Sequence, residues 1–389
     1  MSFRKRNVAL SSNTDPAVKL SQTPSRPQLP GVKPSSIDGR PVTSTGTATL
    51  DGLLAGHGGL ALGCSLLLEE NGTTDYAGAL LKFYAAEGLM QGQYVHVLGL
   101  PDHWARELPG AVSDSERREK SSDRGDKMKI AWRYESLGQF GTSTAGAREP
   151  LRSAAAATAA DSTTSPSAST PFNHTFDLTK RLTPPPNFSV TFHSFSSGPG
   201  ASPFDQLLAS LTASLNTNNT IPHRLIIPSL LSPLLYPPSA GHPHNLLPFF
   251  HQLRSLLSKH PLTILTSMPL PLSPRITGLT RWIELLHDGV IELSPFPHSA
   301  EGLASTSKSK DGSGEEPPQG LLKIHRLPVL ADRGTGVRPA EDDWAFTLSR
   351  RRLMVKEWRL GPVDDDGGGA EHGEGGGSAG EGSKKGMEF

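Results

Sequence analysis

Short apolar runs alternate with longer amphipathic stretches through the middle of the chain. Runs rich in leucine and β-branched residues predict strands at 64–69, 93–99, 188–193, 223–228, 261–267 and 289–294. Leucine stripes at helical spacing predict helices at 76–87, 203–215, 245–259 and 277–287. Strands that are apolar throughout are typical of a sheet covered on both faces, so the pattern predicts an α/β fold with a mostly parallel sheet flanked by helices.

The two ends of this pattern carry further signals. Gly88 follows the first predicted helix and is expected to end it. Towards the C-terminus the alternation of strands and helices stops. Residues 320–328 and 344–360 instead predict consecutive strands, which would form an antiparallel edge of the sheet.

Composition separates the patterned region from tails and insertions. Residues 1–34 hold six basic side chains and one acid, whereas residues 361–389 hold seven acids and two lysines. Both ends lack apolar periodicity and are predicted to be disordered, so a single domain is expected over 35–360. Within it, charge-dense or low-complexity sequence predicts surface insertions at 111–128, 141–170 and 299–319.

Cysteine usage and hydropathy limit the cellular setting. Cys64 is the only cysteine, which excludes an intramolecular disulfide and a multi-cysteine metal site. No stretch of about 18 apolar residues is present, so no membrane span is predicted. No apolar signal segment follows the basic start of the chain. These features favour a protein of the cytoplasm and nucleus.

One strand-to-helix junction, LLLEENGTTDYAG at residues 66–78, lies where nucleotide-binding proteins keep a phosphate loop. In the pattern GxxxxGK[ST], the glycines admit phosphates, the lysine neutralises them and the hydroxyl holds Mg²⁺. Aligned with this pattern, Glu70 and Asp75 replace the glycines, Tyr76 replaces the lysine and Ala77 replaces the hydroxyl residue. The loop is therefore predicted to be a degenerate phosphate loop.

The carboxylate that would hold the metal ion is also missing. No Asp or Glu occurs from Gln206 to Ile283, and the strand at 223–228 ends in Pro228 and Ser229. The chain is therefore predicted to have no catalytic residue, no cofactor and no metal. A noncanonical nucleotide pocket and an unrelated ligand are the alternatives.

The local chemistry of the junction predicts what replaces the phosphate. Thr73 or Thr74 is expected to cap the helix by accepting a hydrogen bond from its first N–H groups. Asp75 would then lie in the first helical turn, where the helix dipole favours a carboxylate. The protein's own anion is thus expected to take the position of a phosphate, although a plain strand–turn–helix needs no ligand at all.

A basic segment near the C-terminus is the candidate for RNA binding. The sequence SRRRLMVKEW, at 349–358, places Arg350, Arg352 and Lys356 on one face of a predicted strand and Arg351 on the other. Such a strand either protects a sheet edge from aggregation or contacts RNA phosphates.

An aromatic pair follows the first insertion. Trp132 and Tyr134 alternate with Ala131 and Arg133. Burial against the domain and anchoring of a protein interface are both compatible with this pattern.

Several stretches resemble known families. Residues 44–70, STGTATLDGLLAGHGGLALGCSLLLEE, resemble the lead-in to the phosphate-loop strand of RecA-like ATPases such as the bacterial clock protein and archaeal recombinases. Residues 70–99, 129–135, 223–237 and 348–358 together look like the PAXNEB family, the fourth subunit of Elongator. The combination of EENGTTDYAG with IAWRYE is specific, and the resemblance covers roughly 30–110, 127–140 and 172–360.

The resemblance implies a RecA-like domain without working nucleotide motifs. It implies two RecA-like partner subunits in a hetero-hexameric ring, accessory to the Elongator catalytic core, and tRNA modified at the wobble uridine (U34) by another subunit. Weak ATP hydrolysis by the ring is also implied, and the residues above do not explain it. Three functions stay open: a noncatalytic ring subunit that contributes to tRNA binding, a divergent ATPase that uses a noncanonical or inter-subunit pocket, and a scaffold without RNA contact.

Overall fold

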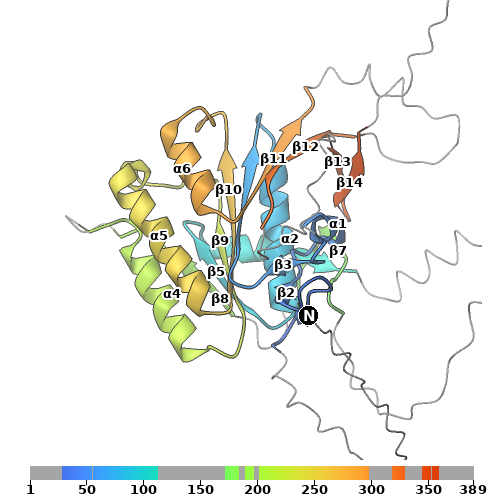
Figure 1. Cartoon of the computed structure of the whole chain (residues 1–389), viewed down its shortest axis with the longest axis horizontal. Helices are drawn as coiled ribbons and strands as arrows, with labels where there is room; N and C mark the ends of the chain where they lie inside the picture. The colour runs from blue at the N-terminus through green and yellow to red at the C-terminus, as the bar shows by residue number, and fades with distance from the viewer. Residues whose placement is uncertain are drawn as a thin grey trace, which may run out of the picture.

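The computed structural model describes residues 29–54, 56–112, 171–183, 189–196, 201–297, 318–328, 344–351 and 353–358. A nine-stranded sheet forms its centre (Figure 1). From one edge to the other, the strands are β14 (Leu353–Glu357), β13 (Trp344–Leu348), β12 (Gly320–Arg326), β11 (Gly289–Pro295), β4 (Ser65–Glu70), β10 (Leu262–Pro269), β9 (His223–Ile227), β5 (Tyr94–Leu98) and β8 (Ser189–His193).

The sheet combines a parallel body with an antiparallel edge. All strands from β11 to β8 in that order pair in parallel. Strands β12, β13 and β14 pair antiparallel beside β11. The predicted α/β class and the predicted antiparallel edge are confirmed.

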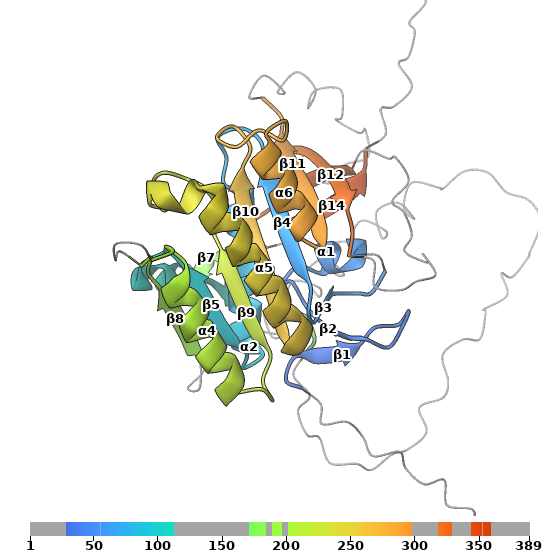
Figure 2. The same ribbon diagram turned by 60° about the vertical axis from the view of Figure 1, so that its left-hand side comes forward.

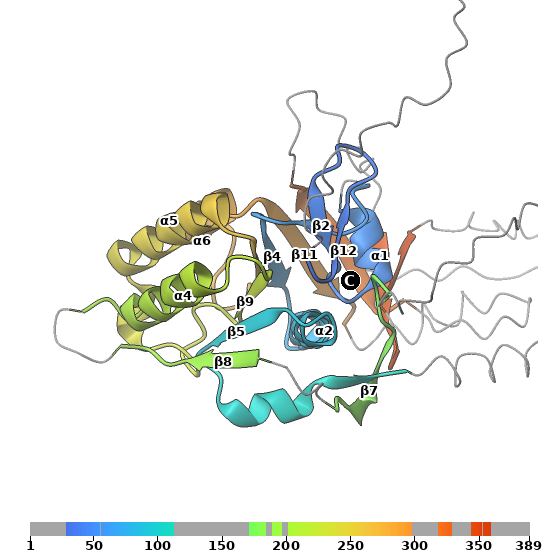
Figure 3. The same ribbon diagram turned by 90° about the horizontal axis from the view of Figure 1, so that it is seen from below.

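Helices cover both faces of the sheet, as Figure 3 shows from below. One face carries α4 (Asp205–Thr217), α5 (Pro243–Lys259) and α6 (Gly278–Leu286), and the other carries α2 (Tyr76–Met90) and α1 (Ala48–Leu53). Strand β4 serves both layers, because Leu67 packs in the α4–α6 core whereas Leu66 and Leu68 pack in the α2 core. This alternation explains why the strand is apolar throughout.

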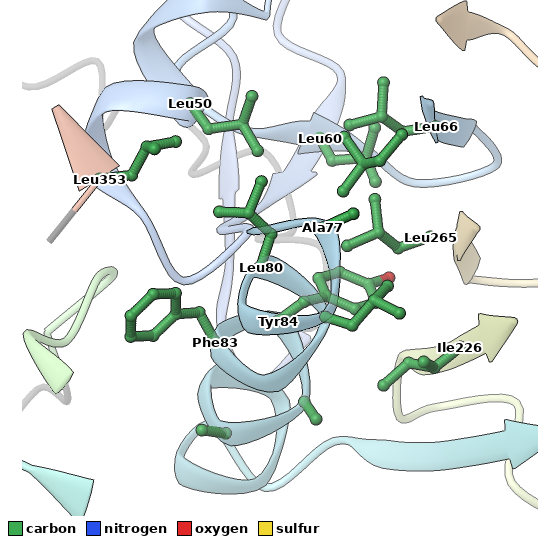
Figure 4. Packing of buried hydrophobic residues seen from close by; sticks show 14 of the residues in the cluster. Leu50, Leu60, Leu66, Ala77, Leu80, Phe83, Tyr84, Ile226, Leu265 and Leu353 are labelled. Carbon is green, nitrogen blue, oxygen red and sulfur yellow. The ribbon is translucent and has the colours of Figure 1, made fainter. Parts of the chain in front are cut away.

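Helix α2 is buried on nearly all sides. Its side chains Leu80, Phe83 and Tyr84 contact strands of the sheet and the N-terminal segment (Figure 4). The predicted end of this helix at Gly88 is wrong, since α2 continues to Met90. Gly88 is needed for space instead: a Cβ there would lie 2.6 Å from Cδ of the buried Arg224.

Two small sheets and two 3-10 helices complete the described structure. The bounds of the remaining elements are β1 (Val32–Pro34), β2 (Pro41–Thr43), β3 (Leu60–Ala61), β6 (Pro109–Ala111), β7 (Phe176–Arg181), η1 (Asp102–Glu107) and η2 (Pro238–Gly241). Strand β1 pairs with β2, so ordered structure begins before residue 35, within the segment predicted to be a tail.

Some predictions fall outside the described residues. These are the aromatic pair Trp132 and Tyr134, the insertion at 141–170, and almost all of the insertions at 111–128 and 299–319. Residues 1–28 and 359–389 also lie outside. Among the described residues, no helix is both long and apolar enough to span a membrane.

Candidate functional site: the end of strand β4

Two consecutive glutamates end strand β4 and point to opposite faces of the sheet, as the alternation along a strand requires. Glu70 lies on the α2 side, within hydrogen-bonding distance of the start of that helix. Glu69 lies on the α4–α6 side, beside Arg275. Both side chains are buried, at 0% exposure for Glu69 and 6% for Glu70.

Glu70 binds the N-terminus of α2. Its Oε1 accepts hydrogen bonds from Tyr76 N at 2.9 Å and from Thr74 Oγ1 at 2.7 Å, and its Oε2 accepts one from Ala77 N at 2.9 Å. The N–H groups of Tyr76 and Ala77 are backbone donors of the kind that bind phosphate at a helix N-terminus. Burial raises the pKa of Glu70, and the hydrogen bonds from Ala77, Thr74 and Tyr76 oppose this shift.

A carboxyl group does take the place expected for the anion, but a different residue provides it. Neither Thr73 nor Thr74 caps the helix: the N-cap residue is Asp75, whose Oδ1 accepts a hydrogen bond from Gly78 N at 3.2 Å. Thr74 donates to Glu70 instead. The prediction of a threonine cap was wrong because Glu70 reaches across the turn and takes the first N–H groups itself.

The two positions that would hold a lysine and a metal-binding hydroxyl serve packing. The ring of Tyr76 packs edge-on against Phe346 of β13, with ring centroids 5.0 Å apart. Ala77 is buried in the core beneath α2. Burial, followed by the nearby charge of Glu70, raises the pKa of Tyr76, so its hydroxyl is neutral at physiological pH.

A small hollow lies beside this loop. Its volume is about 60 Å³, and it is lined by loop residues and by the ends of β9 and β10, including Ser229 and Ser267. Ligand pockets in proteins are typically about 300–1,000 Å³. Ser229 occupies the position after β9 where a metal-binding carboxylate would be expected. Its backbone N–H donates a hydrogen bond to Ser267 Oγ at 2.8 Å. Within the described part of a single chain, the hollow is too small for a nucleotide.

Glu69 belongs to a second cluster on the opposite face, which the sequence did not reveal. Its other members are Arg275 from the loop before α6, Glu284 from α6, Glu292 from β11 and His325 from β12. Arg275 makes a two-pronged contact with Glu284, with Nε 2.8 Å from Oε1 and Nη2 3.1 Å from Oε2. Its Nε also lies 3.2 Å from Glu69 Oε2.

The three carboxyl groups of this cluster titrate differently. Burial, followed by the charge of Glu284, raises the pKa of Glu69 to about 8, so Glu69 is largely protonated at neutral pH. A hydrogen bond from His325 lowers the pKa of Glu292 to about 2. Burial alone would raise the pKa of Glu284, but hydrogen bonding and charge from Arg275 hold it below the ordinary value.

The cluster also contains a possible set of metal ligands. Glu69, Glu292 and His325 each offer one ligand atom, and these three atoms lie within 4.8 Å of one another. The Arg275 guanidinium occupies the same space, with Nη1 2.9 Å from His325 Nε2 and 3.1 Å from Nδ1. Since this cation already balances the carboxylates, the arrangement does not require a metal ion, and the absence of a metal stays a prediction.

Three buried histidines form a second polar feature missed in the sequence. They lie side by side on β8, β5 and β9, where His96 Nδ1 is 3.1 Å from His193 Nε2 and His96 Nε2 is 3.0 Å from His223 Nδ1. Burial lowers the pKa of all three, of His96 to about 3 and of His193 to about 4. They therefore act as a neutral hydrogen-bonded chain between strands.

The basic C-terminal segment forms the β13–β14 hairpin. Arg350 and Arg351 lie in its turn, not on a continuous strand as the sequence predicted, and Arg352 lies outside the described residues. Arg351 Nε lies 3.1 Å from Oδ2 of the buried Asp177. Arg350 and Lys356 have exposed side chains, and β14 is the edge strand. RNA contact by these four residues stays a prediction, with Arg351 already engaged in an ion pair.

Comparisons with known proteins point to one family. The model of the family described as "PAXNEB protein" matches residues 25–389. Elongator complex protein 4 of Schizosaccharomyces pombe is 33% identical over 359 residues, which cover 86% of this chain and 89% of that protein. Elongator complex protein 4 of Saccharomyces cerevisiae is 31% identical over 401 residues, which cover 93% and 81%.

More distant proteins are also similar to the chain. Elongator complex protein 4 of Homo sapiens is 25% identical over 400 residues, covering 93% of this chain and 85% of that protein. The crystal structure of a KaiC-like protein from Pyrococcus horikoshii is 17% identical, with a TM-score of 0.39, and covers 81% of this chain and 98% of that one. The family match over most of the length, together with the two fungal relatives, shows that the chain belongs to the PAXNEB protein family.

Proposed function

We propose that the chain is a noncatalytic, RecA-like subunit of Elongator that supports modification of the tRNA wobble uridine. The relatives that carry the name Elongator complex protein 4 support membership of this complex. In this proposal the chain joins two RecA-like partner subunits in a hetero-hexameric ring beside the catalytic core. The ring works in the cytoplasm and nucleus, and another subunit supplies the chemistry.

The position of Glu70 is the observation that supports the noncatalytic role. Its carboxylate accepts the N–H groups of Tyr76 and Ala77, which a bound phosphate would otherwise use. A phosphate placed there would meet a buried carboxylate rather than a lysine, and like charges repel at short range. The site is therefore filled from within the chain.

Nucleotide titration tests this role. We expect no appreciable binding of Mg-ATP by the isolated chain in calorimetry, and no hydrolysis after Tyr76→Lys with Ala77→Thr, because Glu70 still occupies the helix N-terminus. Low-micromolar binding that Tyr76→Ala abolishes would instead establish a divergent nucleotide pocket. Binding only by the assembled ring would favour a pocket shared between subunits.

The contribution to tRNA binding is proposed for Arg350 and Lys356. Both are exposed, Arg350 in the hairpin turn and Lys356 on the edge strand β14, while Arg351 of the turn forms an ion pair with Asp177. Because phosphate contacts act through counterion release, Arg350→Glu with Lys356→Glu should weaken tRNA binding by the ring most strongly at low salt.

A matched control separates this contact from total charge. Arg106→Glu with Lys259→Glu changes the net charge equally at two exposed positions on other elements. Equal tRNA affinity of the two double variants, with the ring intact, would favour a scaffold that does not touch RNA.

A further inference from the structure

Most of the exposed large apolar side chains among the described residues lie in one short stretch of the chain. Six such side chains are exposed among the described residues, and four of them lie between positions 272 and 285. Their exposed fractions are 56% for Leu272, 88% for Ile276, 55% for Trp282 and 59% for Leu285. We call these four side chains the α6 face.

The geometry of α6 explains the exposure of its two members of the face, Trp282 and Leu285. Ile283 and Leu286 are buried in the core that α6 shares with α5, so the helix is seated on the sheet by that side. Trp282 and Leu285 are three residues apart and therefore share the opposite side. Figure 2 shows α6 on the outer surface of the molecule beside α5. Apolar patches of this kind on a folded protein mark interaction sites.

Leu272 and Ile276 lie on the loop before α6, and the side chain of Arg275 ties this loop to the helix and to the sheet. Arg275 lies next to Ile276, but its guanidinium turns inward and binds Glu284 of α6 and buried Glu69 of β4. Thr277 caps the same helix through a hydrogen bond from Thr280 N. Ile276 is thus presented to solvent on a restrained loop, which lowers the entropy cost of binding a partner.

The charge around the face is positive. Arg281 is exposed on α6 itself, and Arg254 and Arg326 bind the last carbonyl groups of the helix, those of Leu286 and Leu285. The carboxylates beside these arginines are Glu284 on α6, which Arg275 already pairs, and Asp288 just beyond the helix, whose Oδ1 lies 3.7 Å from Arg254 Nη1. A complementary surface therefore needs apolar side chains at its centre and carboxylates at its edge.

We propose that the α6 face is the docking site for a neighbouring protein subunit that presents apolar side chains rimmed by carboxylates. Trp and Arg, here Trp282 and Arg281, are the residue types that most often dominate protein interfaces. Trp282 and the basic edge would also suit RNA, but the other three members of the face, Leu272, Ile276 and Leu285, offer neither a stacking plane nor a hydrogen-bond donor to it. The inference rests on the proposed membership of Elongator.

The test uses the full chain co-expressed with its Elongator partners, with Ile276→Asp as the main variant. Leu234→Asp is the matched control, because Leu234 is also 88% exposed but lies on the loop after β9. We expect Ile276→Asp to weaken co-assembly at least tenfold in native mass spectrometry titrations, and Leu234→Asp to leave it unchanged. Leu285→Ser should repeat the loss from the helix itself. Thermal unfolding of the isolated variants should match wild type.

Other outcomes would overturn the proposal. If Ile276→Asp assembles normally but the complex loses tRNA, the face binds RNA. If the isolated wild-type chain dimerises through this face while the complex is unaffected, a second copy is the occupant. Equal assembly of wild type and Ile276→Asp would overturn this inference alone. A wild-type chain that never joins Elongator would overturn the proposed function, and this inference with it.

Discussion

Glu69 and Glu70 are neighbours in the chain, yet the two faces of the sheet stabilise them in different ways. Glu70 lies at a helix N-terminus, where two backbone N–H groups and one hydroxyl donate to it. No donor from another described residue makes a hydrogen bond with Glu69, whose nearest cation is the Arg275 guanidinium. Burial raises the pKa of Glu70 and the donors oppose this rise, whereas burial and neighbouring carboxylates raise the pKa of Glu69 to about 8 and keep it largely neutral.

The difference shows how a degenerate phosphate loop can stay folded. Losing the ligand would leave the first N–H groups of α2 without an acceptor, and an unsatisfied helix end inside a protein is costly. Glu70 supplies the acceptor permanently. Glu69 accepts no comparable set of hydrogen bonds on its own face of the sheet. Its buried carboxyl group is accommodated because it is largely protonated at neutral pH and lies beside Arg275.

Removing the Glu70 carboxylate should have the largest effect. Glu70→Ala leaves the N–H groups of Tyr76 and Ala77 and the hydroxyl of Thr74 without their acceptor. Hydrogen bonds to a charged group contribute roughly 1.5–3 kcal/mol, so we expect a loss of about 3 kcal/mol in the free energy of unfolding. Denaturant titration measures it. Glu70→Gln, which keeps one acceptor oxygen, should lose less; equal losses would show that the retained oxygen contributes nothing without the charge and the second acceptor.

Glu69 should instead influence how stability depends on pH. Its pKa is raised from 4.5 to about 8 in the folded state, so the stabilisation is fully present below pH 4.5 and is lost as the pH rises through 8. We expect wild type to lose roughly 2 kcal/mol from this group between pH 6 and 8, and Glu69→Gln to show a flatter profile.

In the difference between the stability profiles of wild type and Glu69→Gln, the contributions of the other titrating groups cancel. The histidine chain of β5, β8 and β9 has lowered pKa values. Its contribution to the free energy of unfolding is therefore lost as the pH falls below about 6.5, whereas that of Glu69 is lost as the pH rises. Both proteins contain it, and the difference reports on Glu69. Parallel profiles above pH 6 would show that Glu69 is ionised in the folded protein.

Much of the fold could be predicted because it depends on local periodicity. The runs at 64–69 and 289–294 differ by at most one residue at either end from β4 and β11, and the alternation of side chains along a strand is enough to put Glu69 and Glu70 on opposite faces. The end of α2 could not be predicted from Gly88, because the reason for that glycine is Arg224, a residue distant in the sequence that crosses the helix in the folded core.

The candidate site was only half visible in the sequence. Loss of the lysine and hydroxyl could be recognised at Tyr76 and Ala77, since a motif is a matter of spacing. The identity of the replacing acid could not, because Asp75 adjoins the helix start in sequence, whereas Glu70 is six residues before Tyr76 and reaches it only across the turn. Arg275 and His325 lie more than 200 residues from Glu69, and only the topology, which places β4, β11 and β12 side by side, brings them together. Two consecutive acids ending an apolar strand were the one signal present.

The smallest effect is expected at Asp75, the other acid of the loop. Asp75 caps α2 through one hydrogen bond to Gly78 N, and asparagine caps a helix about as well as aspartate. Asp75→Asn therefore keeps the cap and removes the attraction of the charge to the helix dipole and to Lys82, for a loss of about 0.5 kcal/mol that shrinks as salt is added. Asp75→Ala removes the cap as well and should lose about 1 kcal/mol. Denaturant titrations at low and high salt separate the two terms. If Asp75→Asn destabilised the chain as much as Glu70→Ala does, Asp75 and not Glu70 would be the anion that replaces the phosphate.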